Sequence, residues 1–145
     1  GYAHTETDIL DIHEYELKTS HDFEEKWHKP EERYLRSLAE GFEYKGQPIV
    51  LSEWGGWGIA KFNPIVERPK ASYHLVPDEY AFISRYRDLI KAVADEPTIC
   101  GFCYTQLYDV EGEVNGYLTY DRRWKVSPEK VAKMHRNICN LPREK

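Results

Sequence analysis

The sequence predicts an α/β fold in which parallel strands alternate with helices that cover the outer face of the sheet. Short apolar runs rich in Ile, Val, Leu and aromatic residues are typical of strands. Longer stretches between these runs place apolar side chains at helical spacing. Because strands that alternate with helices are joined by right-handed crossovers, the three strands should lie parallel in one sheet. The length of 145 residues suits one ordinary domain.

The first half of the chain is expected to form two strands with a helix between them. The strands are predicted at residues 8–13 and 48–53, which are short and apolar. The helix is predicted from residue 30 to about residue 43, with acidic residues in its first turn. Its apolar side chains recur at helical spacing: Tyr34, Leu35, Leu38 and Phe42.

The second half should contain two more helices around a third strand. A helix is expected over residues 78–95, because Asp78 can cap its start and Pro97 stops it. Its buried stripe consists of Phe82, Tyr86, Leu89, Ile90 and Val93. The third strand is predicted at residues 98–107. The last helix should begin at Ser127, with Pro128 in its first turn and Val131, Met134 and Ile138 buried.

Composition excludes several classes of protein. The 20 Lys plus Arg and 25 Asp plus Glu residues give a net charge of −5, without the basic run that nucleic-acid binding needs. No apolar run approaches the ~18 residues of a membrane span, so we expect no membrane partner. Neither a signal peptide nor a transit peptide is visible, and the sequence assigns no compartment. Because the chain begins at Gly1 without Met, we expect a processed product or a piece of something longer.

Glu53 is the sharpest catalytic candidate. It ends a predicted apolar strand just before a Gly-rich turn, and simple alternation would place it on the face of Ile49 and Leu51. A carboxylate at the carboxyl end of a parallel strand is typical of catalytic residues in β/α barrels. The alternative is a structural Glu paired with Arg or Lys. Nearby Trp54 and Trp57 are expected to offer flat apolar platforms for sugar rings.

Polar side chains also gather on one face of the first strand. Alternation places Asp11, His13 and Tyr15 together, opposite Leu10 and Ile12, which indicates either a ligand-lined cavity or a structural network. On the third strand, Tyr104 lies on a face that is equally consistent with a cavity wall and with the core.

The remaining reactive side chains predict neither a metal site nor a cofactor. The histidines are scattered, with no pair at the spacing of metal ligands. The acidic cluster Asp109, Glu111 and Glu113 could ligate a cation, but a solvated loop is favoured. We expect Cys100 and Cys103 to be buried free thiols, because residues three apart on a strand point to opposite faces.

Three segments together resemble glycoside hydrolase family 2, which includes β-galactosidases, β-glucuronidases and β-mannosidases. Residues 48–56, Pro-Ile-Val-Leu-Ser-Glu-Trp-Gly-Gly, resemble its nucleophile motif. Residues 101–107 followed by 113–122 resemble the last barrel strand and loop of its β-galactosidase-like members. Residues 8–15 resemble the sixth strand, which ends in an active-site Tyr.

This resemblance implies that residues 1–145 form the C-terminal part of a catalytic barrel. The fold would be a partial (β/α)8 TIM barrel made of about three C-terminal units, strands six to eight, with outer helices. A complete barrel needs at least about 200 residues. Glu53 matches the nucleophile of a retaining β-glycosidase, and Tyr15 matches the Tyr that hydrogen-bonds to it. The implied substrate-binding residues are His13, Tyr15, Trp54, Trp57 and Tyr104.

The sequence also departs from the family pattern. Tyr104 stands where relatives often carry Trp, and Trp54 follows the nucleophile where Tyr or Phe is commoner. The acid/base of the family is the Glu of an Asn-Glu pair, and no such dipeptide occurs in this chain. Since retaining glycosidases need two carboxyl groups, we expect the chain alone to have little or no activity.

Two further hypotheses do not involve catalysis. A sheet cut from a barrel would leave open edges and an uncovered inner face, which favour self-association into a homo-oligomer. The chain could instead be a carbohydrate-binding module that uses Trp54, Trp57 and Tyr104. The sequence does not identify the sugar.

Overall fold

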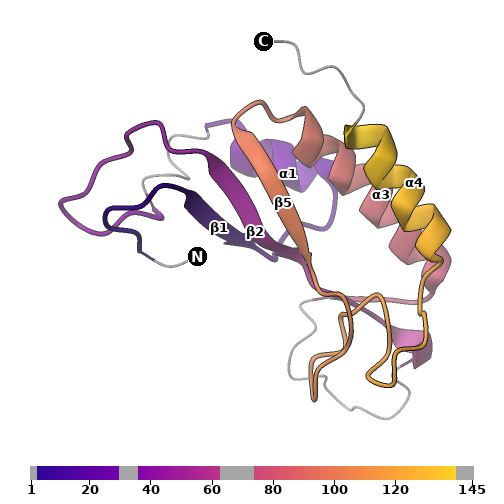
Figure 1. Ribbon diagram of the computed structural model, residues 1–145. Helices are drawn as coiled ribbons and strands as arrows, with labels where there is room; N and C mark the ends of the chain where they lie inside the picture. The colour runs from indigo at the N-terminus through magenta and orange to yellow at the C-terminus, as the bar shows by residue number, and fades with distance from the viewer. Residues whose placement is uncertain (1–2, 30–35, 63–73, 140–145) are drawn as a thin grey trace.

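The computed structural model describes residues 3–29, 36–62 and 74–139, and the statements below concern these residues. Strands and helices alternate along most of the chain (Figure 1). The elements in chain order are β1 (Leu10–Glu14), α1 (Ser20–Trp27), β2 (Ile49–Gly55), β3 (Trp57–Ile59), a 3-10 turn (Ala60–Phe62), β4 (His74–Val76), α3 (Glu79–Asp95), β5 (Ile99–Thr105) and α4 (Pro128–Cys139).

The predicted parallel sheet is confirmed. Strands β1, β2 and β5 form one sheet in that order, and both strand pairs are parallel. All three strands therefore have their carboxyl ends on the same side of the sheet, from which the loop after β5 emerges (Figure 1). Strands β3 and β4 form a separate parallel pair within the long segment that follows β2.

The helices pack on one side of the sheet and bury an aromatic core. Helix α3 contacts both α1 and α4, and α3 and α4 run side by side (Figure 1). The expected stripe of α3 is buried, from Phe82 to Val93. Tyr86 stacks on Trp54 of β2 with ring centroids 5.4 Å apart. The apolar contact across this layer fixes the sheet against the helices.

The helix expected over residues 30–43 is not found in the described part of that range. Residues 36–43 form turns and an isolated bridge, while Tyr34 and Leu35 lie outside the described residues. The backbone of Ser37 and Ala39 pairs with His4, so these groups cannot form helical hydrogen bonds. Gly41 then turns with φ +86°, and Phe42 stays 39% exposed. The apolar spacing predicted a helix, but pairing with a distant segment decided the structure.

The helix of this half of the chain begins earlier. Thr19 caps α1 by accepting a hydrogen bond from the backbone of Asp22, and Asp22 accepts one from the Thr19 backbone. This reciprocal capping box satisfies backbone groups that the first turn would otherwise leave free. The pattern Thr19-Ser20-His21-Asp22 was the available sequence signal.

The prediction that Cys100 and Cys103 are buried is wrong, although both are free thiols. Both side chains are exposed, on a strand that pairs only with β2 among the described strands. Separately, no helix within residues 3–29, 36–62 and 74–139 combines the length and apolar character needed to cross a membrane.

Candidate active site

A β-bulge in β2 determines where Glu53 points. Along β1, Asp11 and His13 are two residues apart, but their partners Val50 and Glu53 are three apart. The pairing of β2 with β5 carries the matching shift between Leu51 and Trp54. An extra residue reverses the alternation of side chains beyond it. Glu53 therefore does not share the face of Leu51, as simple alternation predicted, but faces the polar side chains of β1.

The polar residues of β1 and Glu53 meet at the carboxyl end of the sheet. The hydroxyl of Tyr15 donates a short hydrogen bond to Oε2 of Glu53. The imidazole Nδ1 of His13 lies 3.2 Å from the same oxygen. Tyr15 also lies 3.4 Å from the hydroxyl of Thr105, which ends β5. The contact that the family resemblance implied between Tyr15 and Glu53 is thus present.

Asp11 extends this cluster away from Glu53. One oxygen of its carboxylate accepts a hydrogen bond from the hydroxyl of Ser52 at 2.8 Å, and the other lies 2.9 Å from Nε2 of His4. Nε2 of His13 lies 3.5 Å from Asp11. Burial alone would raise the pKa of Asp11, but the Ser52 hydrogen bond and neighbouring positive charge hold that pKa below its usual value. Asp11 is therefore held as an anion beside His13.

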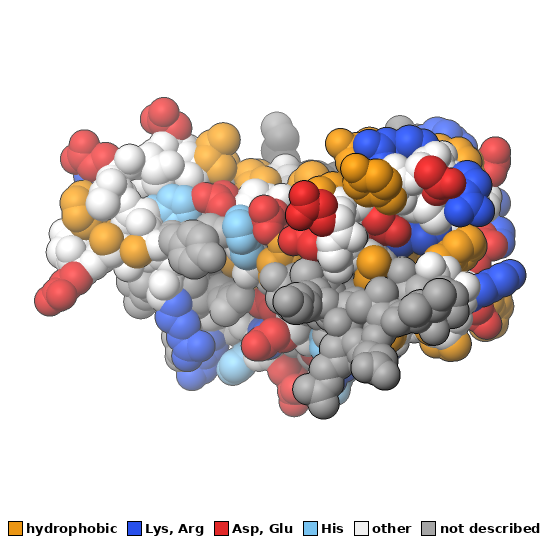
Figure 2. Space-filling model, turned by 90° about the horizontal axis from the view of Figure 1, so that it is seen from below, with side chains coloured by type: hydrophobic (Ala, Val, Ile, Leu, Met, Phe, Trp, Pro, Cys, Tyr) orange, Lys and Arg blue, Asp and Glu red, His pale blue; other side chains and the backbone are white. Residues whose placement is uncertain are grey.

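Glu53 opens onto a cavity of about 510 Å³. Its side chain is 43% exposed, so a ligand can reach the carboxylate. The cavity is lined by Ser52, Glu53, the end of β5, Gln106, Leu107, Tyr117 and His135. Viewed onto this end of the sheet, acidic side chains gather toward the middle of the surface, with histidines beside them (Figure 2). The site combines an accessible anion with hydrogen-bond donors behind it.

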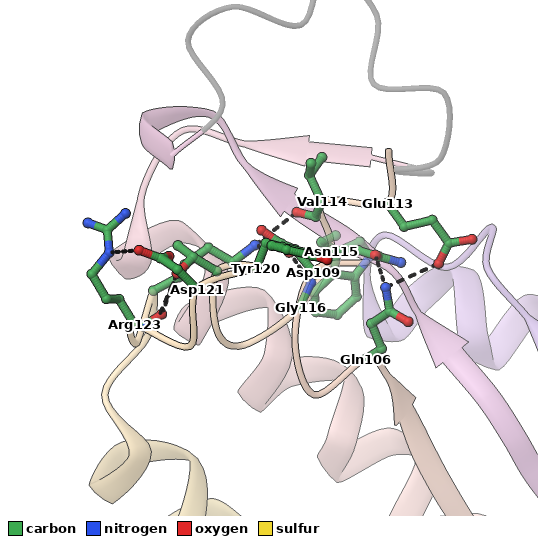
Figure 3. Close-up of polar contacts among 12 residues, drawn as sticks. Gln106, Asp109, Glu113, Val114, Asn115, Gly116, Tyr120, Asp121 and Arg123 are labelled. Atoms are coloured by element: carbon green, nitrogen blue, oxygen red, sulfur yellow. Dashed lines mark hydrogen bonds and ion pairs between the residues drawn. The ribbon is translucent and has the colours of Figure 1, made fainter. Parts of the chain in front are cut away.

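Polar contacts fix the loop that follows β5 (Figure 3). The Gln106 amide donates to the carboxylate of Glu113 at 3.1 Å and to Asn115 at 3.0 Å. Asp109 forms an ion pair with Lys125 at 2.6 Å, and both side chains are buried. The favoured interpretation of a solvated acidic loop is therefore wrong for Asp109, because its carboxylate is buried and forms an ion pair with Lys125. No group of acidic, His or Cys side chains among the described residues could hold a metal ion.

Three predicted substrate-binding residues are placed in the core instead. Trp54 and Trp57 are 0% exposed, and Tyr104 is 7% exposed. The bulge turns Trp54 toward the helices, where it stacks on Tyr86. The Tyr104 hydroxyl accepts a hydrogen bond from the backbone of Trp57 at 3.1 Å. These rings have no free face on which a sugar could stack, so the prediction of sugar platforms is wrong for this structure.

Gly55 permits this close packing. Its φ of +86° is a conformation that side chains disfavour. A Cβ added there would lie 2.4 Å from the Tyr104 ring. The turn after Glu53 therefore requires glycine both for its backbone and for the space beside it.

Sequence reasoning missed three contributors to the cluster. Ser52 and Thr105 reach the polar face because strands β1, β2 and β5 lie side by side. His4 belongs to no strand of the sheet, and its spacing from the other histidines carries no signal for this contact. A hydroxyl next to a catalytic candidate at a strand end was the only available signal for Ser52.

The sequence matches no protein-family model and no curated protein. Several solved structures resemble the chain in fold, and two bacterial β-glucuronidases are among them. A β-glucuronidase of Bifidobacterium dentium, complexed with coumarin-3-O-glucuronide, aligns with 94% of this chain at 17% identity and a TM-score of 0.54. A β-glucuronidase of Faecalibacterium prausnitzii aligns with 94% of this chain at 17% identity and a TM-score of 0.55.

These comparisons concern the fold. The chain spans about a fifth of the length of the two structures, 21% and 22% respectively. It therefore has an α/β fold with a parallel sheet that resembles one part of these glycosidases. At 17% identity, the likeness does not extend to substrate or activity.

Proposed function

We propose that this chain carries the nucleophile side of the active site of a retaining β-glycosidase. In this proposal, residues 1–145 are the C-terminal part of a glycoside hydrolase family 2 catalytic barrel, and β1, β2 and β5 are its sixth to eighth strands. The observation that carries the proposal is the hydrogen bond from Tyr15 to Glu53 at the carboxyl end of the sheet. The motif around Glu53 and the fold likeness to β-glucuronidases support it independently.

Glu53 would attack the anomeric carbon of a β-glycoside. A bond forms between a carboxylate oxygen and that carbon while the bond to the leaving oxygen breaks, which yields a glycosyl-enzyme ester. A second carboxyl group about 5–5.5 Å away would protonate the leaving oxygen and later activate water. No Asn-Glu pair occurs in this chain, so we assign that group to residues beyond it. The chain alone should therefore turn over ordinary glycosides poorly, because it lacks the ~10²–10⁴-fold contribution of the acid.

Activated substrates test Glu53 without requiring the missing acid. A 2,4-dinitrophenyl leaving group departs without a proton, and a 2-deoxy-2-fluoro sugar slows release of the ester. We expect one of the galactosyl, glucuronyl and mannosyl reagents to add a single sugar mass to the chain, mapped to Glu53 by peptide mass spectrometry. The same panel identifies the preferred sugar, for which we expect a galactoside from the motifs.

Two variants serve as controls for this labelling. Glu53→Gln should abolish it, whereas Glu24→Gln changes an exposed carboxylate on α1, in the helix layer, and should leave it intact. Absence of label from every reagent, or a label at another residue, would contradict the proposed nucleophile. Turnover of nitrophenyl β-glycosides by the chain alone, if abolished by Glu53→Gln, would contradict the assignment of the acid/base outside the chain.

A second candidate is self-association through β5. This strand pairs only with β2 among the described strands, and Ile99–Thr105 contains neither charge nor proline. Charged side chains and proline are the usual protection of edge strands, so an edge without them can pair with another strand. The β1 side differs, because the Asp11 carbonyl already lies 2.9 Å from Nε2 of His4. A second copy presents the same uncharged β5 edge, so we propose a twofold homodimer.

Light scattering combined with size-exclusion chromatography tests the dimer. We expect Cys100→Lys to shift the chain to monomer, and Cys100→Ser, which adds no charge at this exposed position, to remain dimeric. A monomeric wild-type chain at high concentration would contradict this candidate. The structure buries the rings of Trp54, Trp57 and Tyr104, which argues against the third hypothesis, a binding module built on them.

A further inference from the structure

The loop that follows β5 carries exposed aromatic side chains on one side of its backbone. Tyr108 pairs with Leu118 in a parallel bridge, and Leu118 pairs with Trp124 in an antiparallel bridge. Residues that face each other across such bridges point to the same side. Trp124 is 51% exposed, and the nearby Tyr120 is 66% exposed. None of these four residues lines the Glu53 cavity, so they belong to a separate surface.

Arg122 joins the aromatic rings into one cluster. Its guanidinium carbon lies 3.5 Å from the centre of the Tyr108 ring and 5.8 Å from the centre of the Tyr120 ring. A guanidinium that stacks on an aromatic face keeps its N–H donors available at its edge. It has five such donors, and the described hydrogen bonds use one, which binds the Tyr120 carbonyl. We call this cluster the loop face, which consists of Tyr108, Leu118, Tyr120, Arg122 and Trp124.

The loop face contains a cation whose charge is not neutralised by a described carboxylate. The other cations of the loop have partners, because Lys125 pairs with Asp109 at 2.6 Å and Arg123 pairs with Asp121 at 2.8 Å. No ion pair of Arg122 occurs within residues 3–29, 36–62 and 74–139. Arg122 therefore presents a positive charge beside open aromatic rings.

The two remaining acidic side chains of the loop lie at a different turn. Glu111 and Glu113 belong to the turn that the bridge between Val110 and Glu113 closes. Figure 3 shows Glu113 and Arg123 at opposite ends of the polar contacts of this loop. The charge of Arg122 is therefore available to a ligand of opposite charge.

Buried contacts on the other side of the backbone hold the loop face in place. Asp109, Thr119 and Lys125 are buried there. The ammonium group of Lys125 donates to the Val114 carbonyl at 3.0 Å in addition to its ion pair, and its backbone N–H donates to the Tyr117 carbonyl at 2.9 Å. A surface that is ordered before binding loses less conformational entropy when a ligand arrives.

The chemistry of the loop face fits a sugar that carries an anionic group. The C–H face of a pyranose ring can pack on an open indole ring in the way that other apolar surfaces do. A carboxylate or sulfate can accept two N–H donors from one guanidinium. A stable protein interface uses roughly 20–30 residues a side, and the loop face has five. A small, charged and aromatic surface of this kind therefore favours a carbohydrate over a protein partner.

We propose that the loop face is a binding site for acidic carbohydrate, in which Trp124 packs on the sugar ring and Arg122 binds its anionic group. The site lies beside the Glu53 cavity, because the carbonyl of Leu107, which lines that cavity, accepts a hydrogen bond from the backbone of Leu118. The site holds carbohydrate without cleaving it. It goes beyond the proposed nucleophile and does not depend on it.

Trp124 provides a probe for the experiment. Of the four tryptophans in the chain, Trp27, Trp54 and Trp57 are buried and Trp124 is exposed. In ¹H–¹⁵N NMR spectra of the whole chain, β-1,4-linked trimannuronate should shift the indole signal of Trp124 and leave the other three unchanged. Mannotriose has the same linkage with uncharged hydroxyl groups at C6, and its half-saturating concentration should be roughly fivefold higher or more. Mannotriose sulfated at C6 distinguishes a site selective for carboxylate from one that binds either anion.

Two arginine variants test the charge. Arg122→Gln should raise the half-saturating concentration of trimannuronate roughly fivefold or more, to a value near that of mannotriose. Arg123→Gln is the matched control, because it changes the neighbouring arginine whose charge pairs with Asp121, and it should leave binding unchanged. The three buried indole signals report whether each variant is folded. If Arg122→Gln disturbs them, added salt tests the same charge in the wild-type chain by weakening the binding of trimannuronate and not that of mannotriose.

Two further variants test the aromatic contact by calorimetry. Trp124→Ser should weaken the binding of trimannuronate and of mannotriose alike, because it removes the ring on which both sugars pack. Tyr80→Ser changes an exposed aromatic side chain on α3 and should leave both affinities unchanged.

Several results would overturn the proposal. These are a Trp124 signal that neither anionic trisaccharide moves, equal binding of mannotriose and trimannuronate, and equal effects of Arg122→Gln and Arg123→Gln. A Trp124 signal that moves with protein concentration in the absence of sugar would assign the loop face to a second copy and would also overturn it. Glu53→Gln should bind trimannuronate normally. Failure of Glu53 labelling therefore leaves this site standing, and failure of binding here leaves the proposed nucleophile standing.

Discussion

The hydroxyl of Tyr15 donates a hydrogen bond to the carboxylate of Glu53, which lies 38 residues further along the chain. Tyr15 directly follows β1, and Glu53 lies near the end of β2. Parallel pairing of these strands brings both residues to the same edge of the sheet. The contact therefore depends on the topology and on the bulge that turns Glu53 toward β1.

Removal of the Tyr15 hydroxyl should slow covalent labelling of Glu53. A hydrogen bond to a charged group contributes about 1.5–3 kcal/mol, which corresponds to a rate loss of roughly tenfold or more if the bond persists in the transition state. Intact-mass spectrometry of Tyr15→Phe over time measures this rate. Tyr44→Phe removes an equivalent hydroxyl that donates to the Gln47 carbonyl, away from the site, and should label normally. A wild-type rate for Tyr15→Phe would show that the bond does not assist Glu53.

The buried ion pair of Asp109 and Lys125 should respond asymmetrically to mutation. Burial lowers the pKa of Lys125, while the Asp109 charge opposes this shift. Asp109→Ala leaves the 0%-exposed Lys125 side chain without its partner and should cost about 3–5 kcal/mol in the free energy of unfolding by urea. Asp109→Leu combined with Lys125→Met removes both charges and should restore most of that loss. A loss below ~1 kcal/mol in the single variant would argue against an essential pair.

Acidification should destabilise the fold through His135. Burial lowers the pKa of His135, whose Nε2 lies 2.6 Å from the Tyr86 hydroxyl. The unfolded chain then takes up a proton at higher pH than the folded chain. Stability from the neutral ring is complete above the unfolded pKa of about 6.5 and is lost as the pH falls through the lower folded pKa.

Urea midpoints at pH 7.5, 6.5 and 5.5 measure this loss. His135→Phe keeps an aromatic ring against Tyr86 and should reduce the decline of the urea midpoint with falling pH. Burial also lowers the pKa of His74, which should account for part of the decline that remains. His21→Phe changes a side chain that is 75% exposed and should leave the decline unchanged. A decline of equal slope in His135→Phe would exclude His135 as its source.

Gly55→Ala should destabilise the turn after Glu53. The new Cβ would lie 2.4 Å from the buried Tyr104 ring, and overpacking of this kind costs about 1–3 kcal/mol beyond the backbone strain at φ +86°. Gly46→Ala is a matched control, because Gly46 has φ +84° and nothing within 4 Å of an added Cβ. The loss of unfolding free energy in Gly55→Ala minus the loss in Gly46→Ala measures the cost of the contact between the new Cβ and the Tyr104 ring. Equal losses would show that the Tyr104 ring moves aside.

Local sequence signals predicted most of the regular structure. The apolar runs located β1, β2 and β5 to within about two residues, and Asp78 and Pro97 bracketed α3 correctly. These predictions succeeded because caps, breakers and short apolar runs act on neighbouring residues. The helix predicted over residues 30–43 failed in its described part because His4, distant in sequence, pairs with Ser37 and Ala39.

The sequence by itself determined the residue types of the site: a carboxylate at a strand end, and Asp11, His13 and Tyr15 on one face. Only the tertiary structure decided which of the candidates meet. Simple alternation placed Glu53 on the face of Leu51. Because β2 contains one extra residue, the Glu53 side chain instead faces His13, and Trp54 lies in the core. A bulge leaves no mark in the local pattern of apolar and polar residues. It follows from how neighbouring strands align their hydrogen bonds and how the aromatic side chains pack behind them.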